Sequence, residues 1–210
     1  MEGTLRQPGL KLIETLGWDG TRLVRKGQHR SRLCRSAVAL GFPCDEARID
    51  AAFASVRGTE CLRVRITLDS TGEVEVTTAP LSQIRQGWRV ALSPQRLRSS
   101  DPWLRLKTTA RERYDAARAA LSADLDEMLF ANERDEVCEG TITNVFFDLG
   151  AGLATPPVDC GLLPGVLREE LLASGRCVES RLRVEDLPRA RLWVGNSLRG
   201  LIECKFVSAD

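Results

Sequence analysis

The sequence predicts an α+β fold with mixed sheets, on the basis of three observations. Strand-like alternation flanks the turn signal Ser70-Thr71-Gly72, which predicts a hairpin. Apolar residues recur at helical spacing in residues 29–40 and 45–56, between strand-like segments. The second half contains many short strand-like runs, but only two helices and one helical turn. Strands and helices that do not alternate regularly are typical of the α+β class.

In the first half, turn and cap residues set the expected boundaries. Asp19-Gly20 predicts a tight turn, so the strand before it should return as a second strand. Gly41-Phe42-Pro43 should stop the helix that begins at His29, and Asp45 can cap the next helix. The expected elements are strands at residues 10–18 and 21–25, helices at 29–40 and 45–56, a hairpin at 61–68 and 73–78, and a strand at 87–93.

A polar stretch, residues 93–101, predicts the connection between two subdomains. Its serine, arginine and proline residues should keep it non-helical. We therefore expect a small N-terminal domain at residues 1–95, an interdomain connection at 96–104 and a larger C-terminal domain at 105–210.

In the second half, a short apolar strand should end at Lys107, where a helix follows. Thr109 can cap that helix, and Tyr114 should lie on its inner face. Proline at 164 and glycine at 175 bracket a second helix in the favoured order. The other expected elements are strands at residues 127–132, 144–149, 153–156, 176–182, 192–196 and 201–207, with a helical turn at 184–190.

Composition excludes several classes of protein. The net charge is +1, which argues against a general nucleic-acid binder. No stretch is long and apolar enough to span a bilayer, and residues 1–7 contain no apolar secretory core. Seven scattered cysteines without a Cys-x-x-Cys pair, and a single histidine, suit unpaired thiols and no zinc site. We expect a cytoplasmic protein without a metal.

A lysine, a carboxylate, an arginine and two turns together suggest a binding site for a cofactor. A lysine at an element boundary, Lys107, can form a Schiff base with an aldehyde. A carboxylate, Glu139, can keep a ring nitrogen protonated, and Arg32 together with turn N–H groups can hold a phosphate. A cofactor that combines an aldehyde, a pyridinium and a phosphate needs this set.

The same residues resemble the class IV aminotransferase family, which uses pyridoxal 5'-phosphate (PLP) and has the fold-type IV architecture. Within it, the sequence is most similar to the 4-amino-4-deoxychorismate lyases, including the form fused behind the synthase. The matching motifs follow the family's order and span nearly the whole chain: Lys11-Leu12-Ile13-Glu14-Thr15-Leu16, residues 29–33, Ser36-Ala37 with Gly41-Phe42, Lys107-Thr108-Thr109, residues 139–147, Gly161-Leu162-Leu163-Pro164-Gly165 and Gly195-Asn196-Ser197-Leu198-Arg199-Gly200.

The resemblance implies a small N-terminal domain, a larger C-terminal domain and PLP in the cleft between them. It also implies a homodimer acting on a small-molecule substrate, with aminodeoxychorismate synthase as a further candidate partner. The implied reaction converts 4-amino-4-deoxychorismate to 4-aminobenzoate and pyruvate, a step of folate biosynthesis. The alternatives are an amino-acid transaminase, of the branched-chain or D-amino acid type, and a catalytically silent relative that acts as a binding subunit.

The resemblance assigns Lys107 as the catalytic residue. His-x-x-Arg-Leu selects Arg32 over Arg30 and Arg35, and His29 is expected to make a structural hydrogen bond. Tyr114 is either a motif residue or a core residue. Glu133, Asp135 and Glu136 are expected at a turn surface. The expected cofactor-binding residues are Lys107, Arg32, Glu139, Val166, Leu167, Ser197 and Asn144, with backbone N–H groups contributed by 166 and 167.

The chain departs from the family in two places. It starts late, without the leading strand and Asp-Arg-Gly stretch that precede Leu10 in full-length members. It also has Glu203 where many members have proline. The late start affects the expected rim of the substrate pocket more than the cofactor site.

Overall fold

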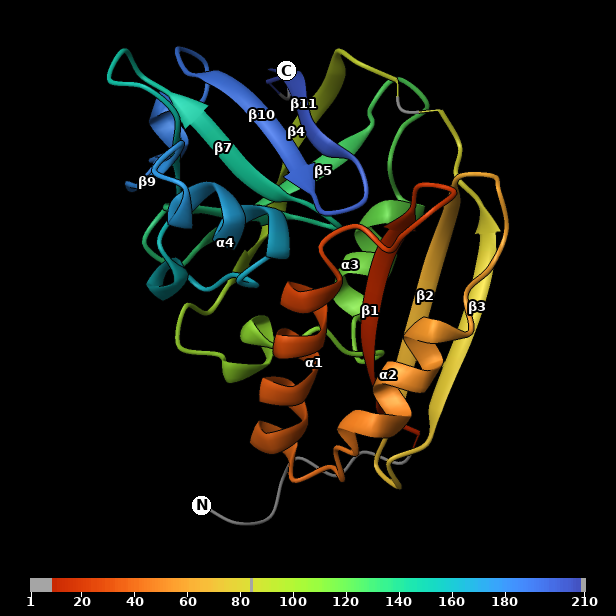
Figure 1. The fold of residues 1–210 in the computed structure, drawn as a ribbon. Coiled ribbons are helices and arrows are strands. Elements are labelled where there is room, and N and C mark those ends of the chain that lie inside the picture. The colour runs from red at the N-terminus through yellow and green to blue at the C-terminus, as the bar shows by residue number, and fades with distance from the viewer. Residues whose placement is uncertain (1–8, 84, 209–210) are drawn as a thin grey trace. The chain divides into compact units, whose positions relative to one another are not determined.

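The computed structural model describes residues 9–83 and 85–208, which form two compact units (Figure 1). The first unit contains the described residues up to Gln83 together with Leu106–Ala110. The second contains the described residues 85–105 and 111–208. The expectation about residues 1–7 lies outside the described residues. Among those described, no helix is long and apolar enough to cross a membrane.

The first unit is an antiparallel three-stranded sheet with two helices. The strand order is β1-β2-β3, in which β1 and β3 form the edges. Leu12 pairs with Leu68, and Ile66 pairs with Val76, so alternate side chains reach one apolar face. The elements are β1 (Lys11–Trp18), α1 (Lys26–Leu40), α2 (Glu46–Ala54), β2 (Leu62–Asp69) and β3 (Val74–Pro80).

Local hydrogen bonds explain where these elements begin and turn. Asp45 caps α2, since its carboxylate accepts from the backbone N–H of Ala47 at 2.9 Å and of Arg48 at 3.3 Å. Asp69 closes the β2–β3 turn by accepting from the N–H of Thr71 and Glu73. The predicted hairpin and the cap of the second helix are therefore confirmed.

The second unit contains a mixed sheet with the strand order β10-β11-β4-β5-β6-β7-β8-β9. β10 also pairs with β7, so six of the strands close into a ring. The pairs β4–β5 and β4–β11 are parallel. The elements are β4 (Trp88–Leu97), η1 (Pro102–Arg105), α3 (Glu112–Ala119), β5 (Glu127–Asn132), β6 (Val137–Gly140), β7 (Asn144–Asp148), β8 (Ala154–Thr155), η2 (Val158–Cys160), α4 (Val166–Ala173), β9 (Val178–Glu179), η3 (Val184–Asp186), β10 (Arg191–Asn196) and β11 (Gly200–Phe206).

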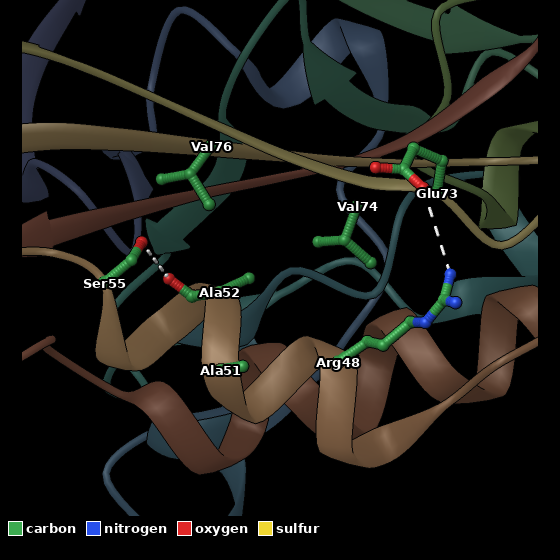
Figure 2. A pocket seen from close by; sticks show the side chains of 7 residues that line it. All are labelled: Arg48, Ala51, Ala52, Ser55, Glu73, Val74 and Val76. Atoms are coloured by element: carbon green, nitrogen blue, oxygen red, sulfur yellow. Dashed lines mark hydrogen bonds and ion pairs between the residues drawn. The ribbon is translucent and has the colours of Figure 1, made fainter.

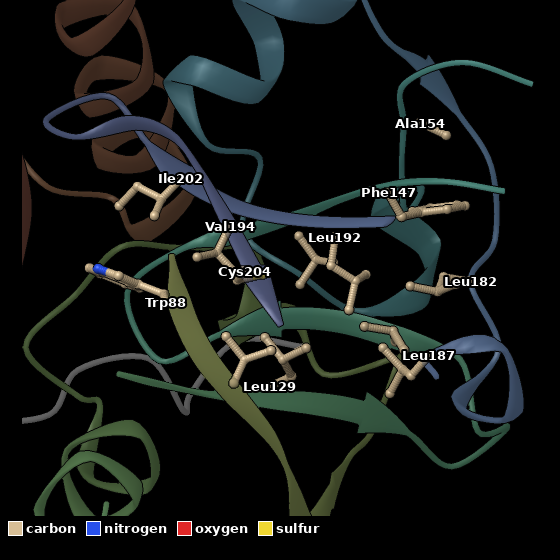
Figure 3. Close-up of a cluster of buried hydrophobic side chains, with 13 residues drawn as sticks. Trp88, Leu129, Phe147, Ala154, Leu182, Leu187, Leu192, Val194, Ile202 and Cys204 are labelled. Carbon is tan, nitrogen blue, oxygen red and sulfur yellow. The ribbon is translucent and has the colours of Figure 1, made fainter. Parts of the chain in front are cut away.

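Apolar side chains of the second unit, most of them from these strands, form a buried core cluster (Figure 3). Leu129 of β5, Phe147 of β7 and Val194 of β10 are at most 2% exposed within it. A second cluster lies under α4, where Leu167 and Leu171 pack with Phe146. The ring strands thus share a packed core, and two of them, β6 and β7, carry the candidate site residues Glu139 and Asn144.

One strand expected in the first half is absent from the structure. No strand occupies residues 21–25: Trp18 makes one isolated bridge with Leu23, and α1 begins at Lys26. The reason is that Asp19 accepts from the N–H groups of Thr21 and Arg22, which folds the chain into a tight turn.

The expected connection at 96–104 also differs from the structure. β4 continues to Leu97 and pairs with β5 there, because Arg96 and Leu97 find ladder partners in Ala131 and Asn132. The two units divide after Gln83 rather than after residue 95, and Leu106–Ala110 returns to the first unit.

Further along the chain, Thr109 does not cap a helix. Its hydroxyl accepts from the N–H of Lys11 at 3.0 Å, and α3 begins three residues later, after Arg111. The helix expected to run on to about Asp124 ends at Ala119, and only Val178–Glu179 form a strand within the segment predicted at 176–182. No strand leads into Lys107, because η1 occupies the preceding residues.

Glu136 was expected at a turn surface, and this is wrong. Glu133 and Asp135 are exposed, but Glu136 is only 4% exposed. Its carboxylate accepts from Arg134 at 2.6 Å and from Asn132 at 2.8 Å. These donors compensate for the loss of water around a buried charge.

Candidate active site

Lys107 is held at the edge of β1. Its carbonyl accepts from the N–H of Ile13 at 2.8 Å, and Thr109 donates to the carbonyl of Lys11 at 2.9 Å. Leu12 and Thr108 form a bridge between these two bonds. The segment therefore extends the first unit's sheet, which fixes the backbone of a half-buried lysine.

Next to this position on β1, Glu14 is the centre of a buried charged cluster. Glu14 and His29 are 1% exposed, and Arg32 is 6% exposed. Arg32 donates to both Glu14 oxygens, from Nε at 2.8 Å and from Nη2 at 2.6 Å. His29 Nδ1 hydrogen-bonds Glu14 Oε2 at 2.6 Å. The structural hydrogen bond expected of His29 is thus confirmed, and its partner is Glu14.

The protonation states of the cluster follow from burial and charge. Burial by itself raises the pKa of Glu14, but the Arg32 charge and the hydrogen bonds from His29 and Arg32 outweigh it, so that pKa is lowered to about 2. Burial lowers the pKa of His29, and the charges of Arg32 and Lys107 lower it further against the opposing effect of Glu14. Lys107 and Arg32 therefore act electrostatically on one histidine.

The competing arginines lie elsewhere on α1. Arg30 is part-exposed and pairs with Glu46 and Asp50, and Arg35 is exposed. Among the three, only Arg32 is buried. A bidentate pair with Glu14 fixes the orientation of its guanidinium.

In the second unit, Glu139 lies on β6 rather than in a loop, and it is 6% exposed. Tyr114 donates its hydroxyl to Glu139 Oε1 at 2.6 Å. The N–H of Leu163 donates to the other carboxylate oxygen at 3.0 Å. Burial and the neighbouring Glu139 charge raise the pKa of Tyr114, so it remains a hydrogen-bond donor. The ring of Tyr114 also packs edge-on against Phe130, so it serves as a core residue too.

Asn144 lies opposite Glu139 in the β6–β7 pairing. Its amide nitrogen donates to the carbonyl of Leu163 at 2.8 Å. A Cβ on Gly165 would lie 1.9 Å from Asn144 Oδ1, so only glycine fits at that position. Asn144 thereby fixes the chain where it enters α4.

Val166 and Leu167 form the first turn of α4, and both are buried. No side chain of the described residues caps this helix. The N–H groups of a helix's first turn have no intrahelical partner and favour an anion. Ser197 is 8% exposed and follows β10, in a turn where Asn196 Oδ1 accepts from the N–H groups of Leu198 and Arg199.

These residues fit PLP by the chemistry of their donors. An uncapped helix start beside an obligatory glycine suits a phosphate, a carboxylate oriented through both oxygens suits a pyridine nitrogen, and the lysine amine suits an aldehyde. The structure places Lys107 and Arg32 in the first unit, and Glu139, Asn144, Val166, Leu167 and Ser197 in the second.

Sequence analysis missed two buried carboxylates, Glu14 and Glu127. The first lies inside a quoted motif and the second begins a predicted strand, but neither position carried a chemical signal of its own. Glu14 contacts Arg32, and Glu127 contacts residues 141–143, only because the fold brings these distant segments together. Each is less exposed than Glu139.

A separate hollow of about 580 Å³ lies between α2 and β3 in the first unit (Figure 2). Val74 and Val76 face it from β3, and Arg48 pairs with Glu73 across 3.9 Å at one end. None of the expected site residues lines this hollow.

Comparisons with known proteins agree with these observations. The model of the family described as amino-transferase class IV matches residues 11–206. A crystal structure of a Mesorhizobium loti protein, with a proposed amino-acid aminotransferase activity, is 46% identical with a TM-score of 0.87, and the match covers 94% of this chain and 100% of that one.

Two curated relatives are more distant. A Schizosaccharomyces pombe protein with a proposed aminodeoxychorismate lyase activity is 29% identical over 78% of this chain and 74% of its own length. A Thermotoga maritima protein with a proposed branched-chain-amino-acid aminotransferase activity is 28% identical over 72% of this chain and 58% of its own. The expected fold-type IV architecture is therefore confirmed, and the chain belongs to the class IV aminotransferase family.

Proposed function

We propose that this protein is a PLP-dependent lyase that converts 4-amino-4-deoxychorismate to 4-aminobenzoate and pyruvate, a reaction that serves folate biosynthesis. The hydrogen bond between Tyr114 and Glu139 carries the proposal. Tyr114 belongs to the lyase-like stretch that begins with Lys107-Thr108-Thr109, and the bond connects that stretch to the carboxylate expected at the cofactor ring. The Schizosaccharomyces pombe relative supports the same reaction.

In this proposal each residue has a defined task. Lys107 would attach the cofactor covalently, Glu139 would face its ring nitrogen, and Arg32 would pair with its phosphate. The N–H groups of Val166 and Leu167 and the hydroxyl of Ser197 would donate to the same phosphate, while Asn144 fixes the start of α4. Bound PLP supplies an electron sink for the charge that develops when the substrate loses a proton.

The proton transfer falls to Lys107. With its amine free, Nζ would accept the proton from the ring carbon that bears the substrate's amino group. Cleavage of the neighbouring C–O bond would release the enolpyruvyl group, which would take this proton to become pyruvate. The ring would thereby become aromatic, which favours the reaction. Burial lowers the pKa of His29, so this ring adds little positive charge beside the lysine.

A second candidate is an amino-acid transaminase, which uses the same lysine to move a proton and then releases a keto acid. The 46% identity to the Mesorhizobium loti protein favours it. Incubation with 4-amino-4-deoxychorismate should give 4-aminobenzoate if the lyase proposal is correct. Formation of glutamate from 2-oxoglutarate and amino acids, without 4-aminobenzoate, would instead establish the transaminase.

Covalent attachment is tested independently of the substrate. Borohydride reduction of the PLP-loaded protein, followed by peptide mapping, should place the pyridoxyl group on Lys107. The other lysines of the sequence, Lys11, Lys26 and Lys205, serve as internal controls. A label on one of them in place of Lys107 would refute the assignment, and a protein that binds no PLP would favour the catalytically silent relative.

We also propose that the protein acts as a homodimer, as is usual in the family, and that it meets aminodeoxychorismate synthase as the source of its substrate. Light scattering should give twice the mass of the chain. A monomeric mass at micromolar concentration would contradict the dimer.

A further inference from the structure

Glu127 is a fully buried carboxylate that none of the steps above uses. It lies at the start of β5 and is 0% exposed. Its side chain contacts residues 141–143, the short loop between β6 and β7. The loop donors are the N–H of Thr141 at 3.0 Å, the hydroxyl of Thr141, the N–H of Ile142 at 3.3 Å and the hydroxyl of Thr143 at 3.0 Å.

This arrangement requires a carboxylate because both oxygens accept. Oε1 receives the two groups of Thr141 and the N–H of Met128, and Oε2 receives those of Ile142 and Thr143. Arg118 lies 3.5 Å from Oε1. A buried charge with this many donors is stabilised, whereas an amide would present its own N–H groups to at least one of them.

The backbone beside the loop is fitted to Glu127. A Cβ on Gly140 would lie 2.9 Å from Glu127 Cδ and 2.4 Å from Thr143 Oγ1. Glycine therefore allows β6 to approach the carboxylate closely. The N–H of Gly140 also donates to the carbonyl of Thr143 at 2.8 Å, which closes the turn.

The loop connects the candidate cofactor residues of the second unit. Glu139 lies one residue before Gly140, which is the last residue of β6. Asn144 is the first residue of β7, after the loop. The carbonyl of Ile142 accepts from Asn196 Nδ2 at 3.1 Å, and Asn196 in turn holds the turn that contains Ser197. Glu127 thus contacts the loop that joins the Glu139 strand to Asn144 and that accepts a hydrogen bond from the Ser197 turn.

We propose that Glu127 is a positioning residue, which fixes the loop so that the Glu139 carboxylate and the Ser197 turn present the correct geometry to PLP. The inference rests on the proposed function, since it assumes that those two residues contact the cofactor. Its effect passes through the loop, and Glu127 itself contacts no reacting atom.

The test compares Glu127→Gln with Glu136→Gln as a matched control. Both replace a buried second-unit carboxylate by its isosteric amide, but the donors to Glu136, among them Arg134 and Asn132, lie outside the loop. Three quantities are measured: amide hydrogen exchange at residues 141–143 without PLP, the dissociation constant for PLP, and the absorbance spectrum of the bound cofactor.

Glu127→Gln should accelerate exchange in the loop and weaken PLP binding by about tenfold, the scale of one lost hydrogen bond to a charged group. It should also move the absorbance spectrum in the same direction as Glu139→Gln does. Glu136→Gln should lower the urea midpoint but leave loop exchange, PLP affinity and spectrum at their wild-type values. If the two variants behave alike in these three measurements, Glu127 is only structural and the inference is overturned.

Thr143→Val provides a second variant if Glu127→Gln does not fold, because it removes one donor and keeps the buried charge. The same three changes should appear at smaller size, and wild-type values would overturn the inference. A wild-type protein that binds no PLP contradicts the proposed function. A wild type that binds PLP, beside a Glu127→Gln variant that binds it equally well and with the same spectrum, contradicts the inference alone.

Discussion

Three buried carboxylates at or beside the candidate cofactor residues, Glu14 in the first unit and Glu127 and Glu139 in the second, are held in different ways. In the first unit, Glu14 is contacted by the side chains of Arg32 and His29, a cation and an ionisable ring. In the second unit, Glu127 accepts mainly from backbone N–H groups and threonine hydroxyls, and Glu139 from a tyrosine hydroxyl and a backbone N–H.

This difference predicts which substitutions lower the stability of the fold and which change the orientation of a carboxylate. Removal of one member of a buried ion pair leaves the other charge without compensation, which is strongly destabilising. A carboxylate held by several neutral donors loses only a fraction of its stabilisation when one donor is removed, but its orientation changes. We therefore expect the Glu14 cluster to govern the folding of the first unit, and the donors around Glu139 to govern turnover.

The largest effect is expected from Glu14→Gln. It removes the carboxylate charge that pairs with the buried Arg32, so the free energy of unfolding should fall by about 3–5 kcal/mol. Urea denaturation measures this. The control is Glu75→Gln, which removes an exposed carboxylate that pairs with Lys11 in the same unit and should leave the midpoint nearly unchanged.

The same cluster predicts how stability depends on pH. The pKa of His29 lies below its ordinary 6.5 and that of Glu14 is about 2 instead of 4.5, so both bind protons less readily in the folded state. Their stabilisation should be complete above pH 6.5 and decline as the pH falls, first through His29 and then through Glu14 toward pH 2. A Glu14→Gln profile that retains the decline below pH 4.5 would show that other carboxyls cause it.

Glu139→Gln should affect catalysis more than binding. The amide keeps the shape but loses the charge proposed to face the ring nitrogen, while Arg32 and the turns proposed to bind the phosphate remain. We expect most of the cofactor to stay bound and turnover to fall about a hundredfold or more, which corresponds to roughly 2.7 kcal/mol. Cofactor content and kcat are measured on the same sample. Loss of cofactor with normal turnover per bound PLP would make Glu139 a structural residue.

Arg32→Ala tests whether the first unit contributes to cofactor binding as well as stability. Removal of a charge-assisted bond to the phosphate should weaken PLP binding by about 1.5–3 kcal/mol. Titration should be carried out where the variant is shown to be folded, since Glu14 loses its pairing with Arg32 and keeps only that with His29 among the partners described above. Arg30→Ala, on the same helix but paired with Glu46, is the control. Equal affinities for PLP in the two variants would remove Arg32 from the site.

The smallest effect is expected from Tyr114→Phe. The ring still packs against Phe130, and the N–H of Leu163 still holds Glu139 Oε2. Loss of one hydrogen bond to the carboxylate should lower kcat about tenfold, or roughly 1.4 kcal/mol, with little change in the urea midpoint. A large loss of stability with unchanged kcat would make Tyr114 a core residue only.

Short-range chemistry made much of the fold predictable. Asp45 and Asp69 accept from backbone groups two to four residues away, so their cap and turn could be recognised from local sequence. Strands 127–132 and 192–196 were recognisable because their buried residues recur in short apolar runs.

Longer-range pairing could not be predicted in this way. Thr109 has the chemistry of a helix cap, but the amide it accepts from belongs to Lys11, 98 residues away. Glu136 has the composition of a turn surface, yet tertiary contacts with Arg181 and neighbouring donors bury it. The same holds for the site, where motifs indicate Lys107, Arg32 and Glu139 but not the buried carboxylates Glu14 and Glu127.

The return of Leu106–Ala110 to the first unit has a consequence for biosynthesis. β1 emerges from the ribosome 98 residues before the segment that pairs with its outer edge, which at common translation rates is a delay of roughly 5–20 seconds. Throughout that time the nascent sheet has an unpaired edge, which is prone to join other chains. A fragment that ends at Gln83 would keep that edge unpaired and would lack Lys107. Neither unit is therefore encoded by one continuous segment of the gene that could be exchanged on its own.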